Sequence, residues 1–197
     1  MDVVNLVKGS FKAFTDNIMA YAVGILVTAL GSFLIVTAPP LMFGLYYMGV
    51  KGARGEKVQI DDVFKGFSYF VKSWTYFIIL GVIISLPFIL GGVFLFLRNS
   101  ALAMVGLGLM ALGILWALVI GIMQIYAVPL IVSKGIGVVE GLKGSVNLVR
   151  RNLVSTVMLF IAVIVVSLLG IIPVAGTIVA EALTLLMVCK TALELKG

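Results

Sequence analysis

The sequence contains no histidine and a single cysteine, Cys189, among its 197 residues. Histidine and cysteine are the main ligands of protein-bound zinc and non-haem iron, so the usual ligand sets for these metals cannot be assembled. One cysteine also excludes an intrachain disulfide and gives no indication of the redox compartment. A serine or cysteine nucleophile has no histidine partner here, and no two carboxylates share one apolar segment. We therefore expect no enzyme activity, no metal and no cofactor.

Charged residues are scarce as well. They make up 11% of the chain, whereas a soluble domain has about 25%. Hydrophobic residues make up 62% of the chain, and the mean hydropathy is +1.27. The longest polar stretch, Lys51 to Lys72, is too short for an appended soluble domain. These proportions predict an all-α integral membrane protein in which residues 1–197 form one membrane domain.

The N-terminal segment lacks the features of a cleaved signal peptide. Asp2 and Asp16 flank an amphipathic stretch, and the apolar segment after it is longer than the roughly 7–15 residues of a signal h-region. A glycine-rich run, GLGLMALG, lies inside an apolar segment and follows no predicted strand, so it is not expected to bind phosphate.

Six apolar segments are candidates to cross a hydrocarbon core of about 30 Å. They are approximately residues 18–36, 39–50, 75–97, 101–132, 153–169 and 174–190. Pro87 and Pro129 are expected to bend the third and the fourth. In this six-span arrangement every Lys and Arg except Arg98 falls on the side of the two termini. Because basic residues concentrate on the cytoplasmic side, both termini are predicted to be cytoplasmic, in the cell membrane.

An amphipathic segment recurs before the apolar hairpins. The stretch VVEGLKGSVNLVRRNL, residues 138–153, is matched 135 positions earlier by VVNLVKGSFKAFTDNI. A weaker third copy, VFKGFSYFVKSW, has Lys65-Gly66 in the place of Lys8-Gly9 and Lys143-Gly144. We therefore predict three parallel repeats, approximately 3–53, 61–133 and 138–195, each with an interfacial helix followed by a membrane hairpin.

Helical wheels place apolar and basic residues on opposite faces of these amphipathic segments. In the middle copy Val63, Phe64 and Phe67 share the apolar face, Asp62 lies opposite, and Asp61 is the expected N-cap. The basic faces are predicted to contact anionic lipid headgroups through Lys8, Lys65, Lys143, Arg150 and Arg151. A solvated basic face that only sets the topology fits equally well. The glycines beside the lysines leave a notch that a lipid phosphate or another helix can approach.

Two polar positions stand out inside the predicted spans. Glu181 is the one acid well inside an apolar segment, with Thr177 and Thr184 on the same helical face. Its carboxyl is either a proton or cation site or, as we prefer, a protonated or hydrogen-bonded group that joins the last helix to its neighbours. Gln124, in the fourth span, is expected to form a hydrogen bond between helices.

The run PPLMFGLYYMGVKGARGEKVQIDDVFKGF resembles the bacterial and archaeal families around the glycerophosphoryl diester phosphodiesterase membrane domain, including the YciC-like proteins. The shared residues are Pro40, Leu41, Gly44, Arg54, Gly55, Glu56, Asp62, Phe64 and Phe67, with Gly141, Leu142, Ser145, Leu148 and Asn152 in a second pattern. The resemblance implies a helical membrane domain of mostly unassigned role. The hydrolytic domain of the diesterase proteins has no counterpart here, so that activity is not carried over.

Two functions agree with these features. The first is a non-catalytic membrane protein that binds anionic lipid or a membrane-protein partner at the cytoplasmic face. The second is a small transporter or channel, as a monomer or a homo-oligomer, with Glu181 on its path. A pore needs polar residues on several spans, and most spans here have none, so the first is preferred. Nucleic acid is not an expected partner, because anionic lipid accounts for the net charge of +6.

Overall fold

The computed structural model describes residues 2–97 and 100–195, and all regular secondary structure in these ranges is helical. In chain order the elements are α1 (Val3–Asp16), α2 (Ile18–Gly31), α3 (Ala38–Ala53), the 3₁₀ helix η1 (Ile60–Tyr69), α4 (Phe70–Phe96), α5 (Ser100–Met123), α6 (Ala127–Lys134), α7 (Val138–Arg151), α8 (Leu153–Ser167), the 3₁₀ turn η2 (Leu168–Ile171) and α9 (Ala175–Glu194). This confirms the predicted all-helical class. Arg98, the one basic residue predicted on the far side, lies outside the described residues.

Four helical segments of the described ranges are long and apolar enough to cross a membrane: Ile60–Phe96, Ala101–Lys134, Leu153–Ile171 and Ala175–Glu194. Helices α1 and α2 meet at 87°, and as one bent pair they bring the number to five. Helices α2 and α3 have 14 and 16 residues. At 1.5 Å per residue they are about 21 and 24 Å long, less than the hydrocarbon thickness of about 30 Å.

The first predicted span is shorter than expected because hydroxyl groups end its helix early. The hydroxyl of Ser32 donates to the Thr28 carbonyl at 2.7 Å, and that of Thr37 donates to the Gly31 carbonyl at 2.5 Å. Both carbonyls also accept a backbone amide, from Ser32 and from Leu34, so each hydroxyl adds a second hydrogen bond at the end of the helix. The chain therefore turns after Gly31 instead of continuing as a helix to residue 36.

The fourth predicted span is broken between α5 and α6. Ser145 of α7 holds the break, because its hydroxyl accepts a hydrogen bond from the Tyr126 amide at 3.2 Å and donates to the Met123 carbonyl at 2.7 Å. Pro129 lies in the first turn of α6, where its missing N–H removes no helical bond. The expected bend is thus a break before Pro129, and it is stabilised by a residue of the next amphipathic helix.

Pro87 has a different effect, because α4 continues through it. A proline cannot donate to the carbonyl four residues earlier, which here belongs to Ile83. The indole N–H of Trp116 in α5 donates to this carbonyl at 2.9 Å. The open carbonyl is therefore satisfied by the partner helix of the α4–α5 hairpin.

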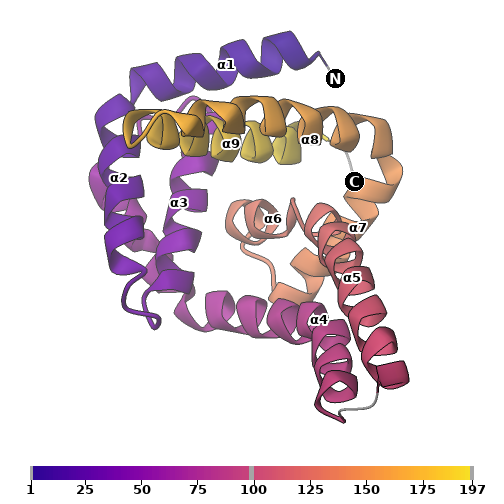
Figure 1. Cartoon of the computed structure of the whole chain (residues 1–197). Helices are drawn as coiled ribbons and strands as arrows, with labels where there is room; N and C mark the ends of the chain where they lie inside the picture. The colour runs from indigo at the N-terminus through magenta and orange to yellow at the C-terminus, as the bar shows by residue number, and fades with distance from the viewer. Residues whose placement is uncertain (1, 98–99, 196–197) are drawn as a thin grey trace.

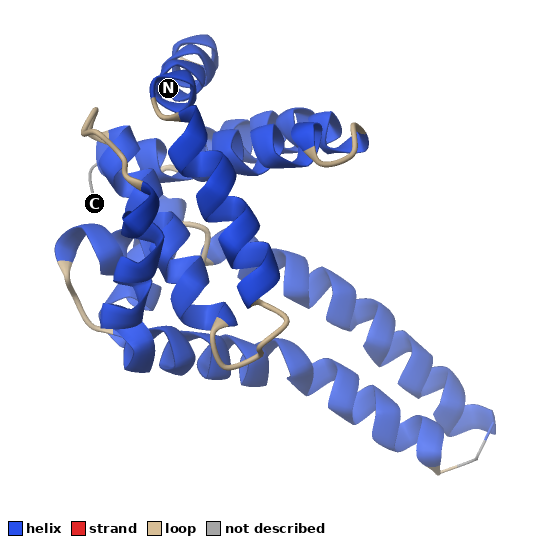
Figure 2. Cartoon of the chain, turned by 90° about the vertical axis from the view of Figure 1, so that its left-hand side faces the viewer, coloured by secondary structure: helices blue, strands red, loops and turns tan. Residues whose placement is uncertain are grey.

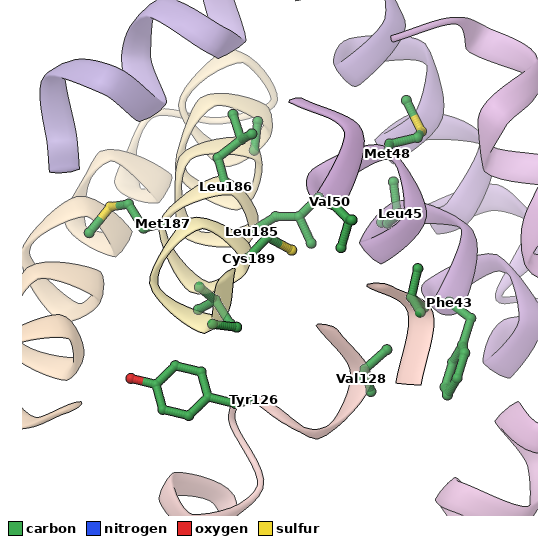
Figure 3. Packing of buried hydrophobic residues seen from close by; sticks show 14 of the residues in the cluster. Phe43, Leu45, Met48, Val50, Tyr126, Val128, Leu185, Leu186, Met187 and Cys189 are labelled. Atoms are coloured by element: carbon green, nitrogen blue, oxygen red, sulfur yellow. The ribbon is translucent and has the colours of Figure 1, made fainter. Parts of the chain in front are cut away.

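The core lies where α3, α6 and α9 pack against one another. Figure 3 shows Val50 of α3 beside Leu185 and Cys189 of α9, with Val128 of α6 nearby. In contrast, α4 and α5 form a long hairpin that extends away from the rest of the molecule (Figure 2). Many large apolar side chains of this hairpin are exposed, as expected for a surface that faces lipid.

Each amphipathic helix packs against the last helix of another predicted repeat. Helix η1 packs on α3, α7 on α6, and α1 on α9. Figure 1 shows α1 running alongside α9. The N-terminal helix thereby contacts the C-terminal one. Each of the three core helices, α3, α6 and α9, packs against one amphipathic helix.

The joints after α1 and α7 have the same local structure. Asn17 and Asn152 end these helices with similar backbone angles, φ −135° and ψ 31° against φ −127° and ψ 41°. Each side-chain amide donates to the carbonyl four residues earlier, at 3.1 Å for Asn17 and 3.0 Å for Asn152. Ser10 is buried like Ser145, but its hydroxyl has no partner in the described part of the chain.

The middle amphipathic segment differs from its predicted form because η1 is a 3₁₀ helix with three residues per turn. Val63 and Gly66 therefore face α3 and are buried. Phe64, Phe67 and Phe70 form a separate, exposed row. The α-helical wheel was wrong in placing Val63 on one face with the phenylalanines, since it assumed 3.6 residues per turn.

The expected N-cap at Asp61 is also wrong. The neighbouring carboxylate of Asp62 accepts the Gln59 amide at 2.8 Å and pairs with the Lys51 ammonium at 2.7 Å. Asp62 is only 5% exposed, although the wheel placed it on the polar face. Its burial follows from its ion pair with the end of α3, which local sequence does not reveal.

Candidate functional site

Three basic side chains are bonded to other parts of the protein. Lys51 pairs with Asp62, as described above. Arg54 donates to the Ser133 carbonyl at 3.2 Å, and Lys72 donates to the carbonyls of Gly135 and Ile136 at 2.9 and 3.1 Å. Arg54 thereby connects the end of α3 to the last turn of α6, and Lys72 connects the start of α4 to the segment between α6 and α7. These cations thus have structural partners.

The five basic residues predicted to contact lipid behave differently. All of them are exposed: Lys8 on α1, Lys65 on η1, and Lys143, Arg150 and Arg151 on α7. Within the described ranges none of them has a hydrogen bond or an ion pair. Their charges are therefore not compensated by the protein and are available to an anionic ligand.

Exposed apolar side chains lie beside these cations. On α1, Val4 and Phe11 are 60% and 52% exposed and lie one turn on either side of Lys8. On η1, Phe64 is 50% exposed next to Lys65, and on α7 Val139 is 54% exposed one turn before Lys143. Unpaired lysines next to exposed apolar side chains are typical of a helix that lies in a membrane interface.

The notches at the glycines beside the lysines are filled by other helices. The Lys190 ammonium of α9 lies against Gly9, and a Cβ at Gly144 would be 3.3 Å from a methyl carbon of Leu130 in α6. Gly66 packs on the backbone of Pro40 and Gly44 in α3. The sequence suggested either a lipid phosphate or another helix as the neighbour of these glycines. The structure shows another helix at each of them.

Glu181 and the two threonines on its helical face do not form a hydrogen-bonded cluster. Glu181 and Thr177 are exposed and Thr184 is half-buried. The Thr177 hydroxyl donates to the Gly170 carbonyl at 3.5 Å, whereas Glu181 makes no hydrogen bond with another described residue. The carboxyl therefore has no such contact that would hold α9 against its neighbours.

We expect Glu181→Leu to destabilise the protein by no more than about 0.5 kcal/mol, the usual range for a surface substitution. The change removes an ionisable group from an apolar helix and breaks no hydrogen bond with a described residue. Thermal unfolding in detergent measures the effect, with Glu181→Gln as the control that keeps the hydrogen-bonding groups. A lower midpoint for the leucine variant alone would show that the carboxyl joins α9 to a neighbour.

Gln124 and Lys143 line the same pocket, although the sequence assigned them to separate sites. The pocket has a volume of about 460 Å³ and lies between α4, α5 and α7. Its other lining residues are Leu80, Ile83, Ile120, Leu142, Val146 and Asn147. The side-chain oxygen of Gln124 is buried and has no hydrogen-bond partner in the described chain, so the helix-to-helix bond expected for it is not formed there. The sequence analysis did not predict Asn147 as a site residue. Its position one helical turn after Lys143 places the two side chains on the same face of α7 and could have indicated it.

Metal ligands do not gather anywhere in the described ranges: no group of three or more histidine, cysteine, aspartate or glutamate residues is close enough to hold an ion. Of the polar groups that line the pocket, the Lys143 ammonium and the Asn147 amide can donate hydrogen bonds to an anion, and the Gln124 oxygen can accept one from a hydroxyl.

Comparison with known families gives one match. A family model described as a domain of unknown function, DUF7847, matches residues 3–195 and thus spans every element from α1 to α9. No curated protein and no solved structure matches the chain. The resemblance to the YciC-like proteins and to the diesterase membrane domain gains no support from this match.

Proposed function

Since this chain belongs to DUF7847, a family of domains of unknown function, we propose its role from its own geometry. The protein is a non-catalytic, multi-pass protein of the cell membrane that binds anionic lipid headgroups at its cytoplasmic face. It does so through the amphipathic helices α1, η1 and α7.

In the proposed topology the chain crosses the membrane six times and both termini are cytoplasmic. The short α2–α3 hairpin is included, because a bilayer thins locally around short helices at modest cost. Three repeats are supported by the shared joint at Asn17 and Asn152 and by the packing of each amphipathic helix on the last helix of another repeat. The position of every basic residue except Arg98 on one side supports the orientation.

One observation carries the proposed lipid binding: the five basic residues predicted to contact lipid are exposed and have no partner among residues 2–97 and 100–195, whereas Lys51, Arg54 and Lys72 are bonded within the protein. Each Lys or Arg near an anionic leaflet contributes about 1 kcal/mol, which salt screens within a Debye length. Five such residues, of which Lys8, Lys65 and Lys143 lie next to exposed apolar side chains, favour a membrane surface of negative charge.

We expect a variant with Lys8, Lys65, Lys143, Arg150 and Arg151 all changed to glutamine to lose most of its bound anionic lipid. The loss of about 1 kcal/mol per charge corresponds to about a fivefold weaker association for each residue. Native mass spectrometry of protein purified from a membrane with anionic lipids measures the lipid that remains bound.

The matched control exchanges Lys for Arg and Arg for Lys at the same five positions, which keeps every charge. This control is expected to retain lipid like the wild type. If the glutamine variant kept the same lipids, and reconstituted wild-type protein moved ions or solutes across liposomes, the transporter function with Glu181 on its path would replace the proposed one.

A further inference from the structure

The pocket between α4, α5 and α7 has a polar end that the protein itself leaves unsatisfied. Lys143 and Asn147 are exposed on α7, and Lys143 has no ion pair in the described chain. Gln124, the residue that follows α5, lines the wall, and its buried side-chain oxygen lacks a partner among the described residues. The Lys143 ammonium and the Asn147 amide N–H groups can donate hydrogen bonds to the oxygens of a phosphate group, whereas the Gln124 oxygen can only accept one, from a hydroxyl of the ligand.

A second pocket lies along the α4–α5 hairpin and is apolar. Its volume is about 550 Å³, and it is lined by Leu86, Pro87, Leu90, Leu109, Leu112, Leu115, Trp116 and Val119. The one side-chain polar group in this lining is the indole N–H of Trp116, which is already bonded to the Ile83 carbonyl. This groove therefore has no polar side-chain group left for a headgroup, and its chemistry suits a hydrocarbon chain.

The two pockets share no lining residue, but the bond between Trp116 and Ile83 joins the wall of one to the wall of the other. Ile83 lines the polar pocket, Trp116 lines the apolar groove, and the two residues are joined at 2.9 Å. Helix α7 contacts α4 and α5. Figure 1 shows α7 next to the end of α5 where the hairpin leaves the core, and Figure 2 shows the hairpin continuing away from it. A ligand with its phosphate at Lys143 would therefore extend along the hairpin.

We infer that these two pockets form a binding site for one anionic phospholipid molecule. The phosphate of the headgroup accepts hydrogen bonds from Lys143 and Asn147, a hydroxyl of the headgroup donates to the Gln124 oxygen, and an acyl chain lies in the groove between Leu90 and Trp116. The inference rests on the proposed lipid binding and specifies one of its sites. Charge complementarity selects an anionic headgroup, because the three polar residues contribute one positive charge and no negative charge.

Trp116 allows this site to be tested directly, because the sequence has only one other tryptophan, Trp74. In a Trp74→Phe variant of the full chain, the fluorescence of Trp116 reports on the groove. The protein is placed in vesicles of phosphatidylcholine that contain a small fraction of phosphatidylglycerol, and either lipid carries brominated acyl chains that quench tryptophan. Brominated phosphatidylglycerol is expected to quench at a lower mole fraction than brominated phosphatidylcholine.

In this background Lys143→Gln is expected to weaken the preference for phosphatidylglycerol about fivefold, as estimated for one lysine near anionic lipid. Lys143→Arg should restore the preference. Lys134→Gln is the matched control, because Lys134 is also exposed and unpaired in the described chain but lies at the end of α6, lines neither pocket and is not among the five proposed lipid-binding residues. The control should keep the wild-type preference.

Equal quenching by the two lipids would overturn the site, and so would an unchanged preference in Lys143→Gln. If the variant with five glutamines still lost its lipids in native mass spectrometry, the proposed function would survive this failure. If Lys143→Gln kept its preference for phosphatidylglycerol and the variant with five glutamines kept its bound lipid, both this site and the proposed function would be overturned. Soluble glycerol 3-phosphate is added as a further arm, and relief of quenching by it would identify a free phosphate ester as the ligand instead of a phospholipid.

Discussion

Replacing Gly66 with alanine is expected to destabilise the protein by about 3 kcal/mol or more, the upper end of the cost of overpacking. A Cβ at Gly66 would collide with the backbone of Pro40 and Gly44 in α3. Backbone atoms cannot rotate away as a flexible side chain does, so the helices η1 and α3 would have to separate. Thermal unfolding of the purified protein in detergent measures the loss.

The contact is reciprocal, which gives a second way to test it. A Cβ at Gly44 would collide with the carbonyl of Val63 in η1, so Gly44→Ala should have a similar effect. The double variant should lose less than the sum of the two, since both changes disrupt one contact. Gly81→Ala is the control: apart from the neighbouring backbone of its own helix, no described atom lies within 4 Å of its Cβ position, and alanine favours a helix by about 1 kcal/mol. If Gly66→Ala unfolded at the same midpoint temperature as the wild type, η1 would not approach α3 this closely.

Removing the carboxylate of Asp62 is expected to cost about 3–5 kcal/mol, because one partner of a buried ion pair is left uncompensated. Asp62→Ala removes the partner of the Lys51 ammonium, whose side chain is only 18% exposed. It also removes the acceptor of the Gln59 amide at the start of η1. Chemical unfolding in detergent measures the change, and added salt should alter it little because buried pairs are weakly screened.

Asp61→Ala is the matched control, since the neighbouring aspartate is exposed and has no hydrogen bond or ion pair within the described ranges. It should change stability by less than about 0.5 kcal/mol. The double variant Lys51→Met with Asp62→Leu should regain part of the loss, because apolar residues often replace a buried ion pair without cost. Equal stability of Asp61→Ala and Asp62→Ala would mean that the Lys51 pair does not stabilise the fold.

Hydropathy and helical periodicity were sufficient to predict the parts of the fold that depend on residues close together in the sequence. The helical class, the amphipathic segments before residues 18 and 153 and the hairpin between α4 and α5 are visible in the sequence. The joints at Asn17 and Asn152 are local too, because each amide bonds to a carbonyl four residues earlier. Similar sequence around such a joint produces similar geometry.

The lengths of the spans were harder to predict, because polar contacts decided them. Apolar residues continue past Gly31 and past Met123, so hydropathy alone extends both helices. In the structure, Thr37 ends the first and Ser145 of α7 holds the break after the second. A hydroxyl that acts on a helix 22 residues away leaves no periodic signal in that helix.

The sequence by itself determined the class of this protein, its amphipathic helices and which basic residues they present, because composition and spacing set these directly. Only the tertiary structure decided which of those residues act together. Lys51 is neutralised by Asp62 across two elements, whereas Lys143 is left free beside Gln124 in a pocket built by three helices. The reason is physical: the partners of a charge are set by which helices pack together, and that packing depends on contacts such as Gly44 with Gly66 between residues far apart in the chain.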